Sequence, residues 1–322
     1  MTAMARQAIW AGKHAAKAVA PAVAASAKKR APPPGSGDWI AGVAMSTAGA
    51  RRFRLYKPPG VQFGERLPLL VMLHGCGQDA KSFALSTRMN RIAAAGRFLV
   101  LYPEQDRMAN PQGCWNWFDT TSGRAYGEAA LIMKAIDQVC WLYAADRDRV
   151  AIAGLSAGAS MAALLVTRHP ERFKALAMHS GVPPGTARSS LSALGAMRGH
   201  QPTRALEATP MAMASHWPPL LVIHGNGDSV VASHNGKAAV EAWATAAGAQ
   251  ACPVRNRQRG KRHASTVTDY KRSGAIVAQL IEIDQLGHAW SGGAANQAFS
   301  DSAGPDASRL VWAFAAKQIA RG

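Results

Sequence analysis

A serine flanked by glycines is the feature of this chain that is best suited to chemistry. Residues 150–164 begin with an apolar run, pass through Gly154-Leu155-Ser156-Ala157-Gly158 and continue into an alanine-rich stretch typical of a helix. Glycines on both sides of a strand–turn–helix junction remove Cβ atoms that would clash in a sharp turn, so the serine hydroxyl can project from it. The start of the following helix favours developing negative charge beside that hydroxyl. Ser156 is therefore the candidate nucleophile, and the alternative is a buried serine beside a glycine-rich helix cap.

Two later segments could supply the partners that a serine nucleophile needs. Asp228 follows the apolar run 220–223 and a Gly-Asn-Gly turn, and His288 follows the strand-like run 275–283. Functional groups of open α/β sheets lie just past the carboxyl ends of the strands. An imidazole with a pKa of about 6.5 can take the serine proton, and a carboxylate can fix its tautomer and stabilise the imidazolium. The order serine, aspartate, histidine is the one found in α/β-hydrolases.

Both partners have alternative roles. Asp228 could cap its own turn, and His288 could be a solvent-exposed loop histidine. Asp284 is the competing acid, but it lies only four residues from His288, too close along the chain to reach around the imidazole. His179 and His224 close strand-like runs, and we expect them to be structural.

The residues expected to stabilise an oxyanion follow an early apolar run, 67–73. This run ends in His74-Gly75-Cys76-Gly77-Gln78. In hydrolases with this serine motif, one oxyanion donor is the amide after the nucleophile and another comes from the loop after an early strand. We assign these donors to the backbone amides of Ala157 and Cys76.

Four motifs taken together resemble one protein family. They are His74-Gly-Cys-Gly-Gln78, Cys114-Trp-Asn-Trp-Phe118, Gly154-Leu-Ser-Ala-Gly158 and Gly287-His-Ala-Trp-Ser-Gly-Gly293. The combination resembles the polyhydroxybutyrate depolymerase-type esterases, a family that includes feruloyl and acetylxylan esterases, and it extends over about residues 38–320. The resemblance implies an α/β-hydrolase fold and hydrolysis of carboxylic esters, with Ser156, Asp228 and His288 as the catalytic triad. It calls for no cofactor and no metal.

The resemblance also bears on substrate and location. It implies short-chain hydroxyalkanoate esters, their oligomers or polyester as substrates, with feruloyl or acetylxylan esters as the alternative. The sequence shows neither an appended substrate-binding domain nor an ordinary secretion signal, and both departures favour soluble esters or oligomers over solid polymer. The family is largely extracellular, so we expect an extracellular location, and a cytoplasmic location is the alternative. A rival from another class is a basic surface-binding protein that uses a hydrolase scaffold only for docking.

Side chains inside the four motifs are candidates for substrate binding. Flat aromatic faces suit polyester or aryl-ester groups, and packing in the core is the alternative. The candidates are His74, Gly75, Trp115, Asn116 and Trp290.

The chain of 322 residues is predicted to hold one catalytic domain, residues 38–322, after a basic tail and Pro/Gly linker, residues 1–37. Alternating patterns predict a mostly parallel central sheet flanked by helices, that is, an α/β fold. Strands are expected at 51–57 on an edge, 69–73, 98–102, 150–153, 174–179, 220–223 and 275–283, and helices at 81–95, 126–143 (with Glu128 on its solvent side), 156–169, 232–247 and 308–320. Two irregular insertions, 104–125 and 181–217, are expected; the second is placed to cover a substrate. No apolar run reaches the length of a membrane span.

The formal net charge of +18 is unevenly spread. The basic residues of the tail have no acidic neighbour, and a second basic cluster extends from Arg255 to Arg272. Such charge favours polyanions and anionic surfaces, so the tail could make a weak contact with an anionic surface, although a disordered tail is the simpler expectation. Neither cluster carries the signature of a nucleic-acid module, and we expect no specific nucleic-acid partner.

The four cysteines fit no zinc-binding spacing. Cys76 and Cys114 lie in two motifs whose loops are expected to converge, which makes them candidates for a disulfide; the alternative is two free thiols. Cys140 and Cys252 are expected to be ordinary thiols.

Overall fold

The computed structural model describes residues 33, 35–200 and 217–321. By its internal contacts the chain divides into two compact units, Met1–Pro34 and Gly35–Gly322. Every described helix and strand lies in the second unit. Residues 1–32 and 34 of the basic tail, and residues 201–216 of the insertion expected at 181–217, fall outside the described residues. Among the described helices, none is both long and apolar enough to cross a membrane.

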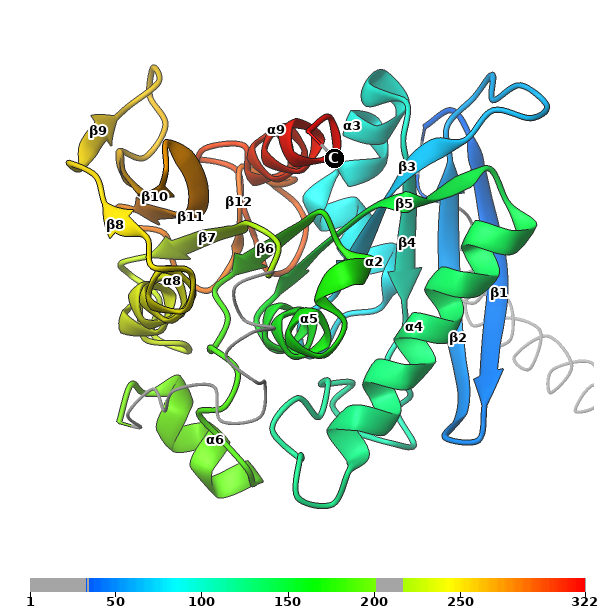
Figure 1. Ribbon diagram of the computed structural model, residues 1–322, viewed down its shortest axis with the longest axis horizontal. Helices are drawn as coiled ribbons and strands as arrows, with labels where there is room; N and C mark the ends of the chain where they lie inside the picture. The colour runs from blue at the N-terminus through cyan, green and yellow to red at the C-terminus, as the bar shows by residue number, and fades with distance from the viewer. Residues whose placement is uncertain (1–32, 34, 201–216, 322) are drawn as a thin grey trace, which may run out of the picture. The chain divides into compact units, whose positions relative to one another are not determined.

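A mostly parallel sheet lies at the centre of Gly35–Gly322 (Figure 1). Its described strands are β1 (Asp38–Ser46), β2 (Gly49–Lys57), β3 (Leu67–Leu73), β4 (Leu99–Pro103), β5 (Ala145–Leu155), β6 (Ala175–His179), β7 (Leu220–Gly225), β8 (Gln250–Ala251), β9 (Arg255–Arg257), β10 (Ser265–Arg272) and β11 (Ala275–Ile283). Their order is β1-β2-β4-β3-β5-β6-β7-β11-β10-β8, and β9 pairs with β10. The strands from β4 to β11 in this order are parallel, whereas those outside them pair antiparallel. A short separate pair joins β12 (Trp290–Ser291) to β13 (Ser300–Asp301).

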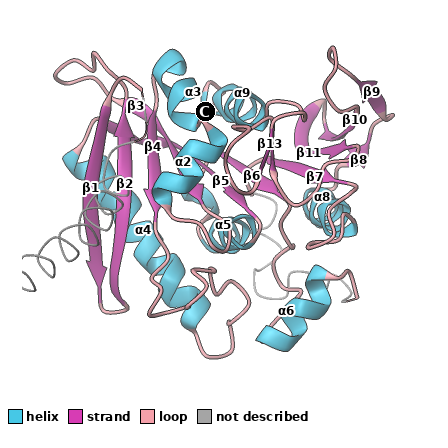
Figure 2. Ribbon diagram, turned by 180° about the vertical axis from the view of Figure 1, so that it is seen from behind, coloured by secondary structure: helices cyan, strands magenta, loops and turns pink. Residues whose placement is uncertain are grey.

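Helices cover both faces of the sheet (Figures 1 and 2). The described helices are α2 (Ala80–Thr87), α3 (Met89–Gly96), α4 (Arg124–Leu142), α5 (Ala157–Arg168), α6 (Ser190–Met197), α8 (His234–Ala247), α9 (Ala307–Ile319) and the short 3₁₀ helix η1 (Pro170–Arg172). Residues of α4, α5 and α8 belong to one buried apolar cluster, and residues of α2, α3 and α9 belong to another. The predicted α/β architecture, with a parallel sheet between helices, is confirmed.

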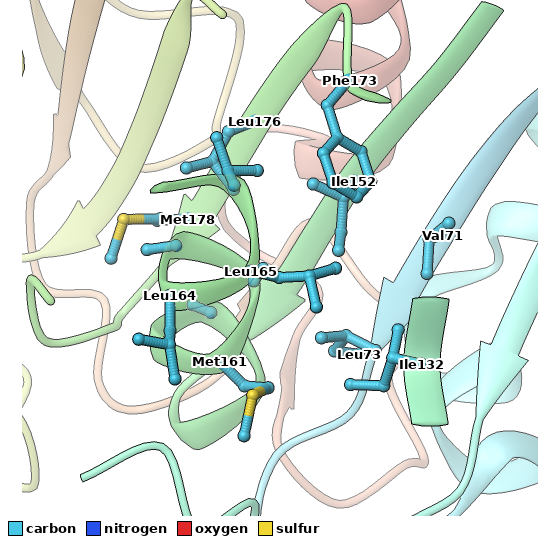
Figure 3. Packing of buried hydrophobic residues seen from close by; sticks show 14 of the residues in the cluster. Val71, Leu73, Ile132, Ile152, Met161, Leu164, Leu165, Phe173, Leu176 and Met178 are labelled. Atoms are coloured by element: carbon cyan, nitrogen blue, oxygen red, sulfur yellow. The ribbon is translucent and has the colours of Figure 1, made fainter. Parts of the chain in front are cut away.

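Strand β3 shows how the two clusters arise from one apolar run. Val71 and Leu73 join the cluster of α4 and α5, where Figure 3 shows them beside Ile132. The alternate residues Leu70 and Met72 join the cluster of α2, α3 and α9. Side chains alternate across a strand, so a strand covered on both faces needs apolar residues at every position. Burial of each large side chain contributes about 1.5–3 kcal/mol, which fixes β3 firmly in the centre.

Two expectations about the elements were wrong, and one long strand was missed. Strand β2 was expected at the edge of the sheet, but β1 lies between it and the edge. The sequence did not reveal β1, because Gly42 interrupts the apolar pattern of that strand. That glycine is needed, since a Cβ there would lie 2.1 Å from the ring of Phe53. The helix expected at 81–95 is two helices, α2 and α3, because Arg88 between them takes a left-handed φ of 55°. The antiparallel strand β10 was not expected, because its polar and basic residues carry no apolar run.

The turn between β5 and α5 leaves no room for a side chain at Gly154 or at Gly158. Ser156 stands there at φ 55° and ψ −124°, a conformation that L-residues rarely adopt. A Cβ at Gly154 would lie 2.4 Å from the carbonyl carbon of Gly158, and a Cβ at Gly158 would lie 2.2 Å from the carbonyl oxygen of Leu73. Glycine at both positions therefore lets the start of α5 pack directly on the end of β3.

This packing predicts opposite effects for two helix glycines. Gly158→Ala places a methyl group against backbone atoms and is expected to lower the free energy of unfolding by about 3 kcal/mol. Gly127→Ala in α4 is the control, because among the described residues its new methyl group would meet only the Cβ of Ala48, at an ordinary 3.6 Å. Alanine is the better helix former, so this control is expected to raise the free energy of unfolding by about 0.5–1 kcal/mol. Urea unfolding measures both; equal effects would contradict the close approach.

Candidate active site

The structure brings together the side chains of Ser156, Asp228 and His288. They follow the carboxyl ends of β5, β7 and β11, which are parallel strands of one sheet. His288 Nε2 lies 2.9 Å from Ser156 Oγ, and His288 Nδ1 lies 2.8 Å from Asp228 Oδ2. The imidazole thus bridges a hydroxyl and a carboxylate, which is the geometry that activates a serine hydroxyl.

Asp228 is held in a charged form. Its side chain is fully buried, and its Oδ1 accepts hydrogen bonds from the amides of Val230 (2.9 Å) and Val231 (2.8 Å). Burial raises the pKa of Asp228, but hydrogen bonds from His224 and His288 outweigh it and keep this pKa well below its usual range. Asp228 therefore both caps its turn and faces His288. The competing Asp284 is exposed and accepts instead from Asn226 Nδ2, at 2.9 Å.

His224 is a second histidine close to the carboxylate of Asp228. Its Nε2 lies 2.9 Å from the carbonyl oxygen of Val231, to which it donates, and 3.5 Å from Asp228 Oδ2. Its Nδ1 is buried and finds no hydrogen-bond partner among the described residues. His224 was expected to be structural; the structure places it in direct support of Asp228.

Two backbone amides near the Ser156 turn are the candidates for holding an oxyanion. Ala157 begins α5, and Cys76 lies in the loop after β3, against which Gly158 packs. In the described part of the chain, neither amide donates a hydrogen bond to another group. Free amides at the start of a helix bind negative charge. The arrangement is thus suited to stabilise a developing oxyanion beside Ser156.

Buried hydrogen bonds fix the loop that carries Cys76. His74 Nδ1 donates to the carbonyl oxygen of Gly75 (2.9 Å), and His74 Nε2 accepts from the amide of Gln105 (3.0 Å). The indole of Trp115 donates to the carbonyl oxygen of His74 (3.0 Å), and Gln78 Oε1 accepts from the amide of Gly75 (3.0 Å). Burial lowers the pKa of His74 to about 4, which agrees with a neutral ring that donates at one nitrogen and accepts at the other.

The expected substrate-binding side chains lie behind the site rather than on its surface. Trp115 and Trp290 are fully buried, as are nearly all atoms of His74 and Asn116, and Gly75 is buried in the braced loop. Trp290 stacks on His179 and donates to Ser308 Oγ at 3.1 Å. The expectation was wrong because aromatic residues beside a reactive motif can equally be the packing that holds it.

A buried polar network, which the sequence did not reveal, supports this loop. Glu128 Oε1 accepts from Asn116 Nδ2 and Gln105 Nε2, both at 2.7 Å, and the guanidinium of Arg51 donates to Gln105 Oε1. Glu128, expected on the solvent side of its helix, is buried. Burial lowers the pKa of Arg51. Periodicity could not find these residues, because charged groups are buried only where distant segments supply partners.

Two further features border the Cys76 loop. A disulfide joins Cys76 to Cys114 and so ties this loop to the irregular segment after β4, while Cys140 and Cys252 are free. The side chain of Phe299 is 42% exposed, and its ring is the nearest group, at 3.8 Å, to a Cβ at Gly77. Sequence reasoning missed Phe299, which no motif or periodic pattern marks. In the described residues no group of three or more histidine, cysteine, aspartate or glutamate side chains could hold a metal ion.

Comparison with known proteins places these features in a family. The family model described as esterase PHB depolymerase matches residues 51–258. Poly(3-hydroxyalkanoate) depolymerase C of Paucimonas lemoignei is 32% identical over 188 residues, which are 54% of this chain and 44% of the relative. Feruloyl esterase B of Neurospora crassa is 27% identical over 210 residues, which are 61% of this chain and 71% of the relative.

A solved structure shares the fold. The acetyl xylan esterase from Aspergillus awamori superposes with a TM-score of 0.62 at 19% identity, over 79% of this chain and 94% of that one. The match to the Paucimonas depolymerase, by contrast, spans less than half of that protein's length.

The disulfide predicts the thiol count of the denatured protein. Without reductant, two thiols should react with Ellman's reagent, those of Cys140 and Cys252, and four should react after prior reduction. Four reactive thiols before reduction would eliminate the bond.

Two buried imidazoles predict how stability depends on pH. Burial lowers the pKa of His74 to about 4 and that of His179 to about 3. In the unfolded chain the pKa of histidine is about 6.5, so the unfolded state binds more protons below that pH. The free energy of unfolding should therefore fall as pH falls from about 6.5 to about 4, by up to about 1.4 kcal/mol per pH unit for each histidine.

Urea unfolding over that pH range measures the slope, and NMR titration of the imidazole rings identifies its source. The rings of His74 and His179 should stay neutral at about pH 5. Protonation of both rings near about pH 6.5 in the folded protein would contradict the prediction.

Proposed function

The chain belongs to the esterase PHB depolymerase family, and from its site we propose that it is a serine esterase that hydrolyses carboxylic esters through an acyl-enzyme. The observation that carries the proposal is the position of His288, within hydrogen-bond reach of both Ser156 Oγ (2.9 Å) and Asp228 Oδ2 (2.8 Å). A hydroxyl needs a base to become a nucleophile, and the base needs an orienting carboxylate.

In the first step Ser156 Oγ attacks the carbonyl carbon of the ester while His288 Nε2 takes the hydroxyl proton. The carbonyl oxygen becomes an oxyanion, which accepts hydrogen bonds from the amides of Cys76 and Ala157. Loss of one such donor typically costs about 3–4 kcal/mol of transition-state stabilisation. His288 then gives its proton to the leaving alkoxy oxygen, the alcohol departs, and the acyl group remains on Ser156.

In the second step water replaces the alcohol. His288 takes a proton from the water, whose oxygen attacks the acyl carbon, and the same two amides hold the second oxyanion. Ser156 Oγ leaves with the proton from His288, and the carboxylic acid is released. The charged Asp228, with its low pKa, stabilises the imidazolium in both steps.

We propose short-chain hydroxyalkanoate esters and their oligomers as the substrates. The family and the relative named poly(3-hydroxyalkanoate) depolymerase C support this class. The exposed ring of Phe299 beside Gly77 offers an apolar contact for an acyl chain at the rim of the Cys76 loop. Feruloyl or acetylxylan esters are the second candidate, which the relative named feruloyl esterase B supports.

The disulfide between Cys76 and Cys114 supports an extracellular location. It braces the loop that carries a proposed oxyanion donor. Disulfides persist in oxidising compartments and are rare in the cytosol. An enzyme whose site depends on such a bond would work outside the cytoplasm.

Removal of the serine hydroxyl tests the proposed activity. With p-nitrophenyl butyrate as substrate, Ser156→Ala is expected to lower kcat/KM on the order of 10⁴- to 10⁶-fold, because acylation has no other nucleophile. Ser160→Ala is the matched control: this serine lies one turn further along α5, and its Oγ accepts from the amide of Val182 at 2.8 Å. The control should lose stability but keep kcat/KM within about tenfold of the parent.

Wild-type activity no higher than background would overturn the esterase proposal and favour a docking role for the scaffold. Matched assays with 3-hydroxybutyrate oligomers and methyl ferulate then test the substrate class. A strong preference for methyl ferulate would overturn the hydroxyalkanoate assignment but leave the mechanism in place.

A further inference from the structure

A cavity of about 220 Å³ lies outside the proposed catalytic site. It opens among the junction of α2 and α3, the loop between β9 and β10, and the start of α9. Four arginines line it, Arg88, Arg91, Arg262 and Arg309, together with one acidic residue, Asp306. The four come from three segments far apart in the sequence, so the fold itself gathers this positive charge.

Two of the arginines are anchored to the main chain. The guanidinium of Arg88 donates to the carbonyl oxygen of Gly292, and that of Arg262 donates to the carbonyl oxygen of Gly304. Both residues are partly buried. A guanidinium has five N–H donors, and each of these bonds uses one nitrogen, so both heads keep donors for a ligand while their positions are fixed.

The other two arginines leave the positive charge poorly balanced. Arg309 Nε lies 3.4 Å from Asp306 Oδ2, and Asp306 also accepts from the amide of Arg309 as the cap of α9. Arg91 is exposed, and although its backbone amide donates to the carbonyl oxygen of Arg88, its guanidinium makes no hydrogen bond or ion pair to another described residue. Four cations therefore face a single carboxylate that is already engaged. Like charges held close together repel, and an anion between them would relieve that repulsion.

We propose that this cavity binds a phosphate-type oxyanion, either as free phosphate or as the phosphate group of a larger molecule. Guanidinium groups match such oxyanions because their planar forks donate paired hydrogen bonds to two oxygens at once. A phosphate offers more acceptor oxygens than a carboxylate does, and so can engage several guanidinium groups. The volume suits a small ligand, since sites for drug-sized molecules have about 300–1,000 Å³.

The site is connected to the loop that carries His288. Arg88 holds Gly292 of that loop, and Ser308 Oγ, at the start of α9, accepts from the Trp290 indole and donates to the carbonyl oxygen of Thr87 at 2.6 Å. A ligand that bridges Arg88 and Arg309 would thus tie together the segments that support this loop. Binding requires no ester hydrolysis, so the inference is independent of the proposed function.

The test measures binding of inorganic phosphate and of phenyl phosphate to the full chain by calorimetry, with thermal unfolding at constant ionic strength as a second readout. We expect saturable binding of at least one of the two and a rise in Tm, because a ligand of the native state stabilises it. The double variant Arg91→Gln/Arg309→Gln should lose at least about tenfold in affinity. Both side chains are exposed, so the variant should fold.

The matched control is Arg257→Gln/Arg272→Gln, which removes the same charge from exposed positions on β9 and β10. It should keep the affinity of the parent. Tighter binding of inorganic phosphate would identify the free ion as the ligand, and tighter binding of phenyl phosphate would identify a phosphate ester. The absence of saturable phosphate binding up to about 10 mM would overturn the proposal. An equal loss of affinity in both double variants would also overturn it, because that result shows only the effect of net charge.

Discussion

The start of α5 lies against the end of β3 with no room for a side chain between them. A Cβ at Gly158 would lie 2.2 Å from the carbonyl oxygen of Leu73 and 2.5 Å from that of His74. This contact sets the position of the Ser156 turn relative to the loop after β3, and so places the two free amides, of Ala157 and Cys76, at one end of the sheet. In the proposed mechanism the rest of the site depends on that distance, because an oxyanion can be shared only by donors that face the same point.

Strain in the turn is balanced by the packing around it. A serine at such a positive φ costs about 1–3 kcal/mol and persists only where its surroundings determine it. Here the amide of Ser156 donates to the carbonyl oxygen of His179 at 2.9 Å, and every residue from Ala157 to Thr167 is buried. Two buried imidazoles support the neighbouring loops. His74 forms hydrogen bonds within the loop that carries Cys76, and His179 Nε2 accepts from the amide of Ser291. Burial lowers the pKa of both histidines and keeps them neutral. Rigid neighbours therefore hold Ser156, the proposed nucleophile, in a backbone conformation that would otherwise relax.

Much of the fold could be predicted from the sequence, because parallel strands buried on both faces leave apolar runs and the serine turn leaves its glycines. The order of Ser156, Asp228 and His288 likewise marked three strand ends that the sheet brings to one edge. The remainder depends on contacts between distant segments. No sequence pattern shows that Glu128 is buried and accepts hydrogen bonds from Asn116 and Gln105. Nor does one show that the indole of Trp115 donates to the carbonyl oxygen of His74. The burial preference of a residue type predicts that its side chain is buried, but not whether it lines a site or supports it from the core.

On the proposed function, the folded turn, rather than the serine alone, makes Ser156 reactive. Treatment with a fluorophosphonate probe, followed by intact mass and peptide mapping, tests it most directly. We expect one phosphonyl group on the native protein, on the peptide that contains Ser156, and none on the protein unfolded in urea. Labelling at another residue, or equal labelling of the native and unfolded chains, would contradict it.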